Sequence, residues 1–144
     1  MSAEPSPEHL RALILASQTI AVLGAHADRG RAAHYVPAYM AENGCRVVAV
    51  NPTLAGGGLF GEPALARLAE LSAPVDMVLV FRRSECLMDH VPEILAMAPR
   101  PAVVWFQLGI RNDGAAAALR AAGIDVVQDR CLMVDHRRLV GARG

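Results

Sequence analysis

The stretch from Thr19 to Arg31 constrains the fold more than any other part of the sequence. It reads TIAVLGAHADRGR, and its first five residues are mostly apolar, partly β-branched and uncharged, which is typical of a strand buried on both faces of a parallel sheet. Gly24 follows where the chain must turn, and a residue without a Cβ lets a ligand approach the main chain. A segment suited to a helix, Ala32–Asn43, comes next. Strand, glycine turn and helix open nucleotide-binding α/β folds, although parallel α/β proteins without a phosphate site begin in the same way.

Composition limits the classes of protein to which the chain can belong. Its 144 residues, 53% of them hydrophobic, suit one domain with one core. There is no run of about 18 or more apolar residues, so we expect no membrane span, and the polar, acidic start does not resemble a secretion signal. The three cysteines, Cys45, Cys86 and Cys131, are too widely spaced for a metal-binding pair. We therefore expect a cytoplasmic protein in a reducing environment.

The charged residues narrow the choice of ligand. The formal net charge is zero, which does not favour nucleic acid as a partner. Apart from histidine, every basic residue is an arginine. A P-loop lysine and a Schiff-base lysine are therefore both excluded from this sequence.

Strand-like and helix-like segments alternate along the chain. We expect strands at Thr19–Leu23, Arg46–Val50, Val75–Phe81, Ala102–Phe106 and Asp125–Val127, and a short edge strand at Gly58–Phe60. We expect helices at Glu8–Ser17, Ala33–Asn43 with Pro37 in its first turn, Ala64–Leu71, Ser84–Leu95 capped by Ser84, and Gly114–Ala122 capped by Asp113. This pattern predicts an α/β fold: a Rossmann-like, doubly wound parallel sheet in a single three-layer domain. The strand order is 3-2-1-4-5-6 if the edge strand joins the sheet.

Arginines follow the carboxyl ends of several expected strands. Because these ends meet at the ligand-binding edge of a doubly wound sheet, the arginines indicate an anion with several phosphates. Backbone N–H groups of the Gly24 turn and a helix N-terminus would help to bind it. The alternative is a solvated rim in which the arginines pair with Asp28, Glu85, Asp113 and Asp129. The arginines are Arg29, Arg31, Arg82, Arg83, Arg111 and Arg130.

The residues around the first two strands bear on which nucleotide would bind. The dinucleotide fingerprint GxGxxG is absent, because Gly24 is followed by Ala25, His26 and Ala27. An NAD site usually has an acidic residue at the end of the second strand, where this chain has Asn51 and then Pro52. NAD is therefore disfavoured, whereas NADP stays open because arginines suit a 2′-phosphate.

Six short motifs occur in order along the chain. They are the glycine and arginine pattern of Gly24–Arg31, V-N-P at Val50–Pro52, F-G-E at Phe60–Glu62, V-D-x-V-x-V-F-R-R at Val75–Arg83, W-x-Q-L-G at Trp105–Gly109 and V-V-x-D-R-C at Val126–Cys131. Together they resemble the small stand-alone CoA-binding proteins, whose Rossmann-like domain also occurs in the α subunit of succinyl-CoA synthetase and in NDP-forming acyl-CoA synthetases. The resemblance covers about Leu10 to Leu139. His26 stands where that family usually has serine.

The resemblance implies a set of ligand-binding residues. The Gly24–Arg31 loop, with Ala25, His26 and Arg29, would hold the CoA phosphates through backbone N–H groups and Arg31. Asn51 and Pro52 would border the adenosine end. Phe81, Arg82 and Arg83 would flank the nucleotide, and Gln107, Leu108 and Gly109 would lie along the pantetheine path.

Three hypotheses on function follow. The first is a protein that binds CoA or an acyl-CoA without catalysis of its own, with no catalytic or metal-binding residue. The second is an NADP-dependent reductase, and the third is the detached CoA-binding subunit of an acyl-CoA synthetase, which implies a partner synthetase chain. Cys131, beside Arg130, is either a reactive thiol or a packing residue. Asp129 and Asp135 are expected to pair with Arg130 or Arg137 rather than to act as an acid–base pair.

Overall fold

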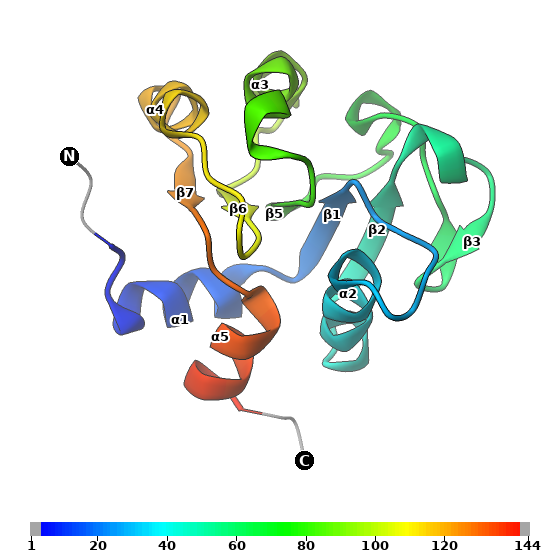
Figure 1. Ribbon diagram of the computed structural model, residues 1–144, viewed down its shortest axis with the longest axis horizontal. Coiled ribbons are helices and arrows are strands. Elements are labelled where there is room, and N and C mark those ends of the chain that lie inside the picture. Colours follow the sequence, from blue (N-terminus) through cyan, green and yellow to red (C-terminus); the bar gives the residue numbers. More distant parts are fainter. Residues whose placement is uncertain (1–3, 142–144) are drawn as a thin grey trace.

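A five-stranded parallel sheet forms the middle layer of the domain, in the order β2-β1-β5-β6-β7 (Figure 1). The computed structural model describes residues 4–141. The strands are β1 (Thr19–Leu23), β2 (Arg46–Val50), β5 (Met77–Val80), β6 (Val103–Phe106) and β7 (Asp125–Val127). From β1 the chain builds β2 on one side and then returns to build β5 on the other. The switch in strand order therefore lies between β1 and β5, where such sheets bind their ligands.

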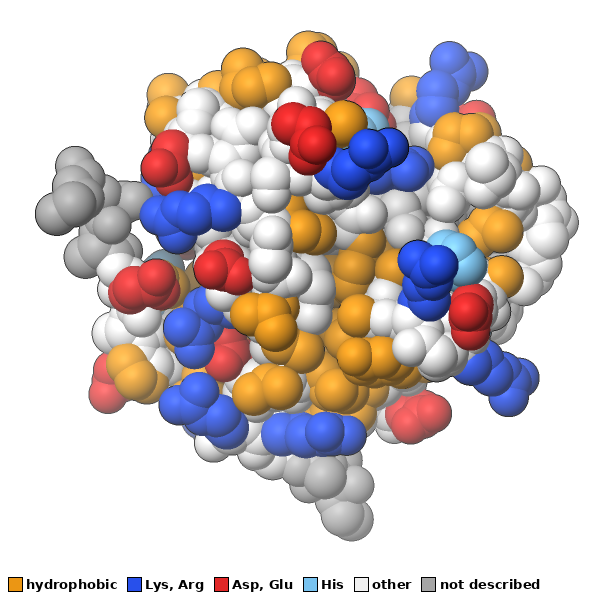
Figure 2. All heavy atoms as spheres, viewed as in Figure 1, with side chains coloured by type: hydrophobic (Ala, Val, Ile, Leu, Met, Phe, Trp, Pro, Cys, Tyr) orange, Lys and Arg blue, Asp and Glu red, His pale blue; other side chains and the backbone are white. Residues whose placement is uncertain are grey.

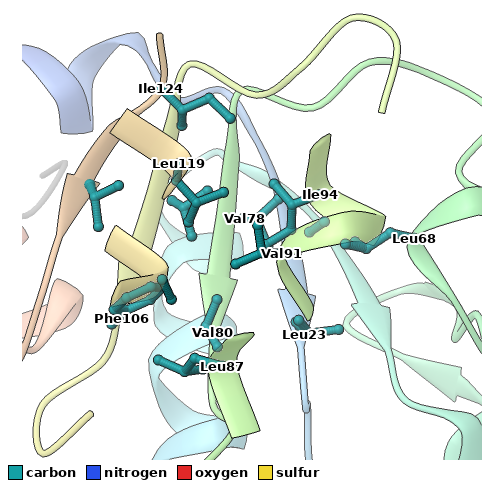
Figure 3. Packing of buried hydrophobic residues seen from close by; sticks show 14 of the residues in the cluster. Leu23, Leu68, Val78, Val80, Leu87, Val91, Ile94, Phe106, Leu119 and Ile124 are labelled. Carbon is teal, nitrogen blue, oxygen red and sulfur yellow. The ribbon is translucent and has the colours of Figure 1, made fainter. Parts of the chain in front are cut away.

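Helices cover both faces of the sheet, which confirms the predicted fold class (Figure 1). Helices α3 (Leu87–Leu95) and α4 (Asp113–Ala121) lie on one face. Helices α1 (Pro7–Ala16), α2 (Ala32–Glu42) and α5 (Leu132–Leu139) lie on the other. Successive strand residues point to opposite faces, so each strand contributes to two apolar clusters. Figure 3 shows the first cluster, in which Val78 and Val80 of β5 pack with Leu87, Val91 and Ile94 of α3.

The predicted strand at Gly58–Phe60 is present as β3 (Gly58–Leu59), but its predicted place at the edge of the central sheet is wrong. Strand β3 (Gly58–Leu59) pairs antiparallel with β4 (Glu62–Pro63) in a separate hairpin, so the central sheet has five strands and not six. The reason is the turn between them, where Phe60 and Gly61 have φ values of 56° and 86° and reverse the chain at once. A two-point ion pair then ties the hairpin to β2, with Arg46 Nε and Nη2 each 2.8 Å from a Glu62 carboxylate oxygen.

One predicted helix is absent from the structure, and one helix is present that the sequence did not predict. The segment Ala64–Leu71 is not an α-helix and contains only the 3-10 turn η2 (Leu68–Glu70), because Leu65 is extended beside β2 and exchanges backbone hydrogen bonds with Ala49 and Asn51. Helix α5 was not expected at all. Its buried face is formed by Leu132, Asp135 and His136, two of which are polar, so apolar periodicity gives only a weak signal there.

The ends of the helices also differ from expectation in detail. The N-cap of α4 is Asn112, whose Oδ1 accepts a hydrogen bond from the Ala115 amide, and Asp113 is the first helical residue. Ser84 opens the 3-10 turn η3 (Ser84–Cys86) and does not cap α3, because its Oγ accepts from the Arg111 amide. Pro37 lies inside α2 rather than in its first turn.

Candidate binding site at the switch in strand order

Gly24, directly after β1, lies against the main chain that follows β5. This residue has φ of 90°, and a Cβ built on it would lie 2.6 Å from the carbonyl oxygen of Phe81. Only glycine combines that backbone conformation with that close approach. The close approach that requires glycine at this turn thus comes from the main chain after β5, which lies beside Gly24 in the fold, and not from its neighbours in the chain.

Asn51 holds the loop after β1 in place. Its Nδ2 donates to the Ala25 carbonyl at 2.8 Å, while its Oδ1 accepts from the Thr53 amide at 3.0 Å and from Thr53 Oγ1 at 2.9 Å. The last contacts cap the 3-10 turn η1 (Pro52–Leu54). The side chain of Asn51 is therefore engaged in supporting the loop, and its contact with adenosine, like that of exposed Pro52, stays a prediction.

His26 is anchored to α2 through both of its backbone groups. Its N–H donates to the Ala33 carbonyl at 3.2 Å, and its carbonyl accepts from His34 Nδ1 at 2.9 Å. The ring Nδ1 of His26 accepts from the Asp28 amide at 2.9 Å. In the neutral imidazole the proton is then on Nε2, the ring nitrogen left to donate to a ligand.

A cavity of about 520 Å³ opens beside this loop. The loop before α2 contributes Gly24, His26 and Arg31, the segment after β5 contributes Phe81 to Glu85, and the loop after β6 contributes Gly109 and Ile110. Seven of the residues predicted from the sequence therefore line one cavity: Gly24, His26, Arg31, Phe81, Arg82, Arg83 and Gly109. Ala25 lies buried beneath the loop.

The charge of the cavity lining is mainly positive, with three arginines and one glutamate. Within residues 4–141, Arg31, Arg82 and Arg83 form no ion pair. The Nε atom of Arg82 is buried and has no hydrogen-bond partner among the described residues. The guanidinium of Arg82 thus has a donor that nothing in this part of the chain satisfies.

The N-terminus of α2 adds backbone donors to the same cavity. Ala32 and Ala33, the first two residues of the helix, line it, and their amides find no backbone acceptor among the described residues. The helix has no acidic residue in its first turn, and Arg31 makes no side-chain cap. An 11-residue helix with an uncapped N-terminus favours an anion there. The sequence placed this helix correctly but could not show that its first amides face the cavity.

The other three arginines do not reach this cavity. Arg29 lines a separate groove of about 860 Å³ between α2, the hairpin and α5. Arg111 Nε lies 3.3 Å from Asp113 Oδ1. Arg130 binds the buried carboxylate of Asp135 at 2.7 and 2.9 Å, and this hydrogen bonding raises the pKa of Arg130. The alternative of pairing with the named acidic residues thus applies to Arg111. The predicted pairing of Asp135 with Arg130 is confirmed, whereas that of Asp129 is wrong: it forms no ion pair within residues 4–141, and its carboxylate accepts from the Gly109 amide instead.

Figure 2 shows how charged side chains are distributed over the face that is also viewed in Figure 1. Basic side chains are spaced around this face, several beside acidic ones, and hydrophobic side chains gather toward its lower centre. A continuous cationic surface is not visible in this view. The positive charge of the cavity is therefore a property of its own lining and not of a broad cationic face.

Residues after β7 support the far rim of the cavity. Gly109 donates its N–H to Asp129 Oδ1 at 2.6 Å, and the Asp129 amide donates to the Ile110 carbonyl at 3.1 Å. Gln107 is buried, and its Oε1 accepts from the Leu132 amide at 3.3 Å. Gln107 therefore joins the rim to α5, and its contact with pantetheine stays a prediction. Sequence reasoning missed the supporting role of Asp129, whose only signal is the tolerance of aspartate for its φ of 55°.

A model of the CoA-binding domain matches residues 18–137, a range that includes the whole cavity lining. The chain belongs to the CoA-binding domain family. This CoA-binding domain is 35% identical to protein YneT of Bacillus subtilis over 133 residues, which are 92% of this chain and 95% of YneT. The resemblance inferred from the six motifs is confirmed.

Solved structures show that this CoA-binding domain has relatives with the same fold. The structure of cell-free ID.343 from Thermus thermophilus shares 54% sequence identity with a TM-score of 0.89, and the match covers 94% of this chain and 99% of that one. A hypothetical protein from Pyrococcus horikoshii OT3 shares 26% identity with a TM-score of 0.88, over 98% and 99% of the two chains. The arrangement of sheet and helices is therefore common to these proteins.

Residues 4–141 contain neither a membrane-spanning helix nor a cluster of metal ligands. No helix in this range is long and apolar enough to cross a bilayer. No group of three or more His, Cys, Asp or Glu side chains in the same range is arranged to hold a metal ion.

Proposed function

We propose that this protein binds coenzyme A or an acyl-CoA in the cavity at the carboxyl ends of β1, β5 and β6, with no catalysis of its own. The observation that carries the proposal is the lining of this cavity, where Arg31, Arg82 and Arg83 form no ion pair within residues 4–141 and the first amides of α2 have no backbone acceptor among these residues. Guanidinium groups and the amides of a helix N-terminus are donors that bind phosphate oxygens.

The proposed ligand would extend across the sheet edge. Its phosphates would lie against Arg31, Arg82 and the first amides of α2, where positive charge is concentrated. Its pantetheine would run toward Gly109 and Ile110, at the rim formed by the loop after β6.

Arginine variants test this proposal. We expect Arg82→Ala and Arg83→Ala each to weaken CoA binding, measured by calorimetry, by about 1.5–3 kcal/mol, the usual contribution of a hydrogen bond to a charged group. Arg100→Ala is the matched control, because exposed Arg100 lies before β6 at the opposite end of the sheet. Unchanged affinity in both cavity variants would assign these arginines to the solvated rim instead.

Ligand preference separates the proposal from the NADP-dependent reductase. At about 100 times its dissociation constant, a ligand specific for the folded state adds about 2.7 kcal/mol of stability. For a domain of this size that is about 5–11 °C in melting temperature. We expect CoA to produce this shift and NAD to produce little. If NADPH stabilises the protein and CoA does not, the reductase replaces the binding protein as the better hypothesis.

The proposal includes a role in acyl-CoA metabolism in the cytoplasm, where the thiols of Cys45, Cys86 and Cys131 would stay reduced. The detached synthetase subunit makes the same ligand prediction and differs only in its partner. Co-purification with an ATP-grasp chain would favour that hypothesis. If the chain binds CoA but purifies without a partner from the same cells, the stand-alone binding protein is the better hypothesis.

A further inference from the structure

The position of Pro37 inside α2 has a structural consequence for the loop beside the cavity. Helix α2 runs from Ala32 to Glu42, and Pro37 is buried within it. Because proline has no N–H, it donates no hydrogen bond to the carbonyl four residues earlier, which belongs to Ala33. Proline is the least favourable residue in a helix interior for this reason.

The Ala33 carbonyl accepts a hydrogen bond from outside the helix instead. The donor is the N–H of His26, at 3.2 Å. His26 and Ala33 both line the cavity, on the two sides of the loop that carries Arg31. The carbonyl oxygen of Ala33, which Pro37 leaves without a helical donor, is thus the atom that joins the start of the loop, at His26, to α2.

We propose that Pro37 is a positioning residue for the cavity. By keeping the Ala33 carbonyl free of a helical donor, it lets the His26 amide bind there and holds the loop in its ligand-ready form. Any other residue at position 37 supplies an N–H that competes for the same oxygen. The effect on affinity rests on the proposed function, whereas the effect on the His26 amide does not.

A second proline, at the same position of its own helix but exposed where Pro37 is buried, provides a control. Pro92 lies inside α3 and frees the carbonyl of Met88 in the same way. Among residues 4–141, no backbone N–H from outside α3 donates to that carbonyl. Neither Pro92 nor Met88 lines the cavity. Replacing Pro92 therefore tests the general effect of restoring a helical N–H without touching the loop.

The experiment compares Pro37→Ala and Pro92→Ala in the full chain. We expect Pro37→Ala to bind CoA about tenfold more weakly by calorimetry, the loss that corresponds to about one net hydrogen bond. Hydrogen exchange of the His26 amide, followed by NMR, is expected to accelerate about tenfold, and the new amide at position 37 is expected to be protected. Pro92→Ala is expected to leave both the CoA affinity and His26 exchange at their wild-type values.

Exchange of the His26 amide and affinity for CoA test separate parts of the inference. Unchanged exchange of the His26 amide in Pro37→Ala would overturn the inference, whether or not the affinity falls. Faster exchange with unchanged affinity would overturn the part that concerns binding. If wild-type protein binds no CoA, the proposed function fails, but the exchange measurement still decides the role of Pro37. Should Pro37→Ala fail to fold, Pro37→Val refills more of the buried volume and restores the same N–H.

Discussion

Replacing Gly24 by alanine should destabilise the protein for two separable reasons. The first is the φ of 90°, which side chains rarely adopt and which costs about 1–2 kcal/mol for a residue with a Cβ. The second is the approach of the new Cβ to within 2.6 Å of the Phe81 carbonyl oxygen, a backbone atom that cannot rotate away. Forcing the two strand ends apart costs about 1–3 kcal/mol more, as overpacking does in a core.

Gly123→Ala separates these two causes. Gly123 has a nearly equal φ of 87°, but a Cβ there meets nothing within 4 Å. We expect Gly123→Ala to lower the melting temperature by about 2–8 °C, and Gly24→Ala by about 4–20 °C, at about 2–4 °C per kcal/mol for a domain of this size. Thermal melts followed by circular dichroism, together with urea titrations, provide the comparison. Equal losses in the two variants would refute the argument that the approach to Phe81 requires glycine.

Three other predictions concern single side chains. His26→Ala should weaken CoA binding by about 0.5–1.5 kcal/mol, because it removes the ring donor, and an unchanged affinity by calorimetry would mean that the ring does not contact the ligand. Under diamide, CoA should form a mixed disulfide with Cys131 in preference to the other two cysteines, and peptide mapping that finds adducts evenly spread would contradict this. The hydrogen bond from Arg46 lowers the pKa of Glu62. In urea titrations, wild type should therefore be more stable than Glu62→Gln by the full amount above the ordinary carboxylate pKa. This difference in stability should disappear as the pH falls through the lowered pKa of Glu62. A difference that does not depend on pH would exclude the ion pair as its source.

The arginines show where prediction from sequence succeeds and where it stops. Their place after the strand ends follows from the sequence, because strand boundaries are local and the ends of parallel strands share one edge. Their partners follow from it only where they lie close in the chain. Arg130 binds Asp135, five residues later, as predicted. The sequence does not show that Arg82 lines the cavity and, among the described residues, forms no ion pair, although Glu85 lines the same cavity.

The hairpin and α5 show a second limit. Gly58–Phe60 has the composition of a strand, but its partner depends on a turn whose strained Phe60 is held by packing against the cluster on the α2 side of the sheet. Helix α5 buries the charged Asp135 and the polar His136, which pattern reasoning assigns to solvent. The partner of His136 is distant in the sequence, since the Tyr39 hydroxyl of α2 lies 2.7 Å from His136 Nδ1, whereas Asp135 is bound by nearby Arg130.

The alternation of apolar strands with helices, the glycine after β1 and the arginines after the strand ends are properties of short segments. They were sufficient to determine the layered parallel sheet and the edge that carries the site. The close approach of Gly24 to Phe81, the unsatisfied donor of Arg82 and the hydrogen bond from His26 to Ala33 exist only once distant segments are packed together. Periodicity sets which face of an element is buried, but a hydrogen bond depends on angles and on distances within a few tenths of an ångström, and only the assembled fold decides these.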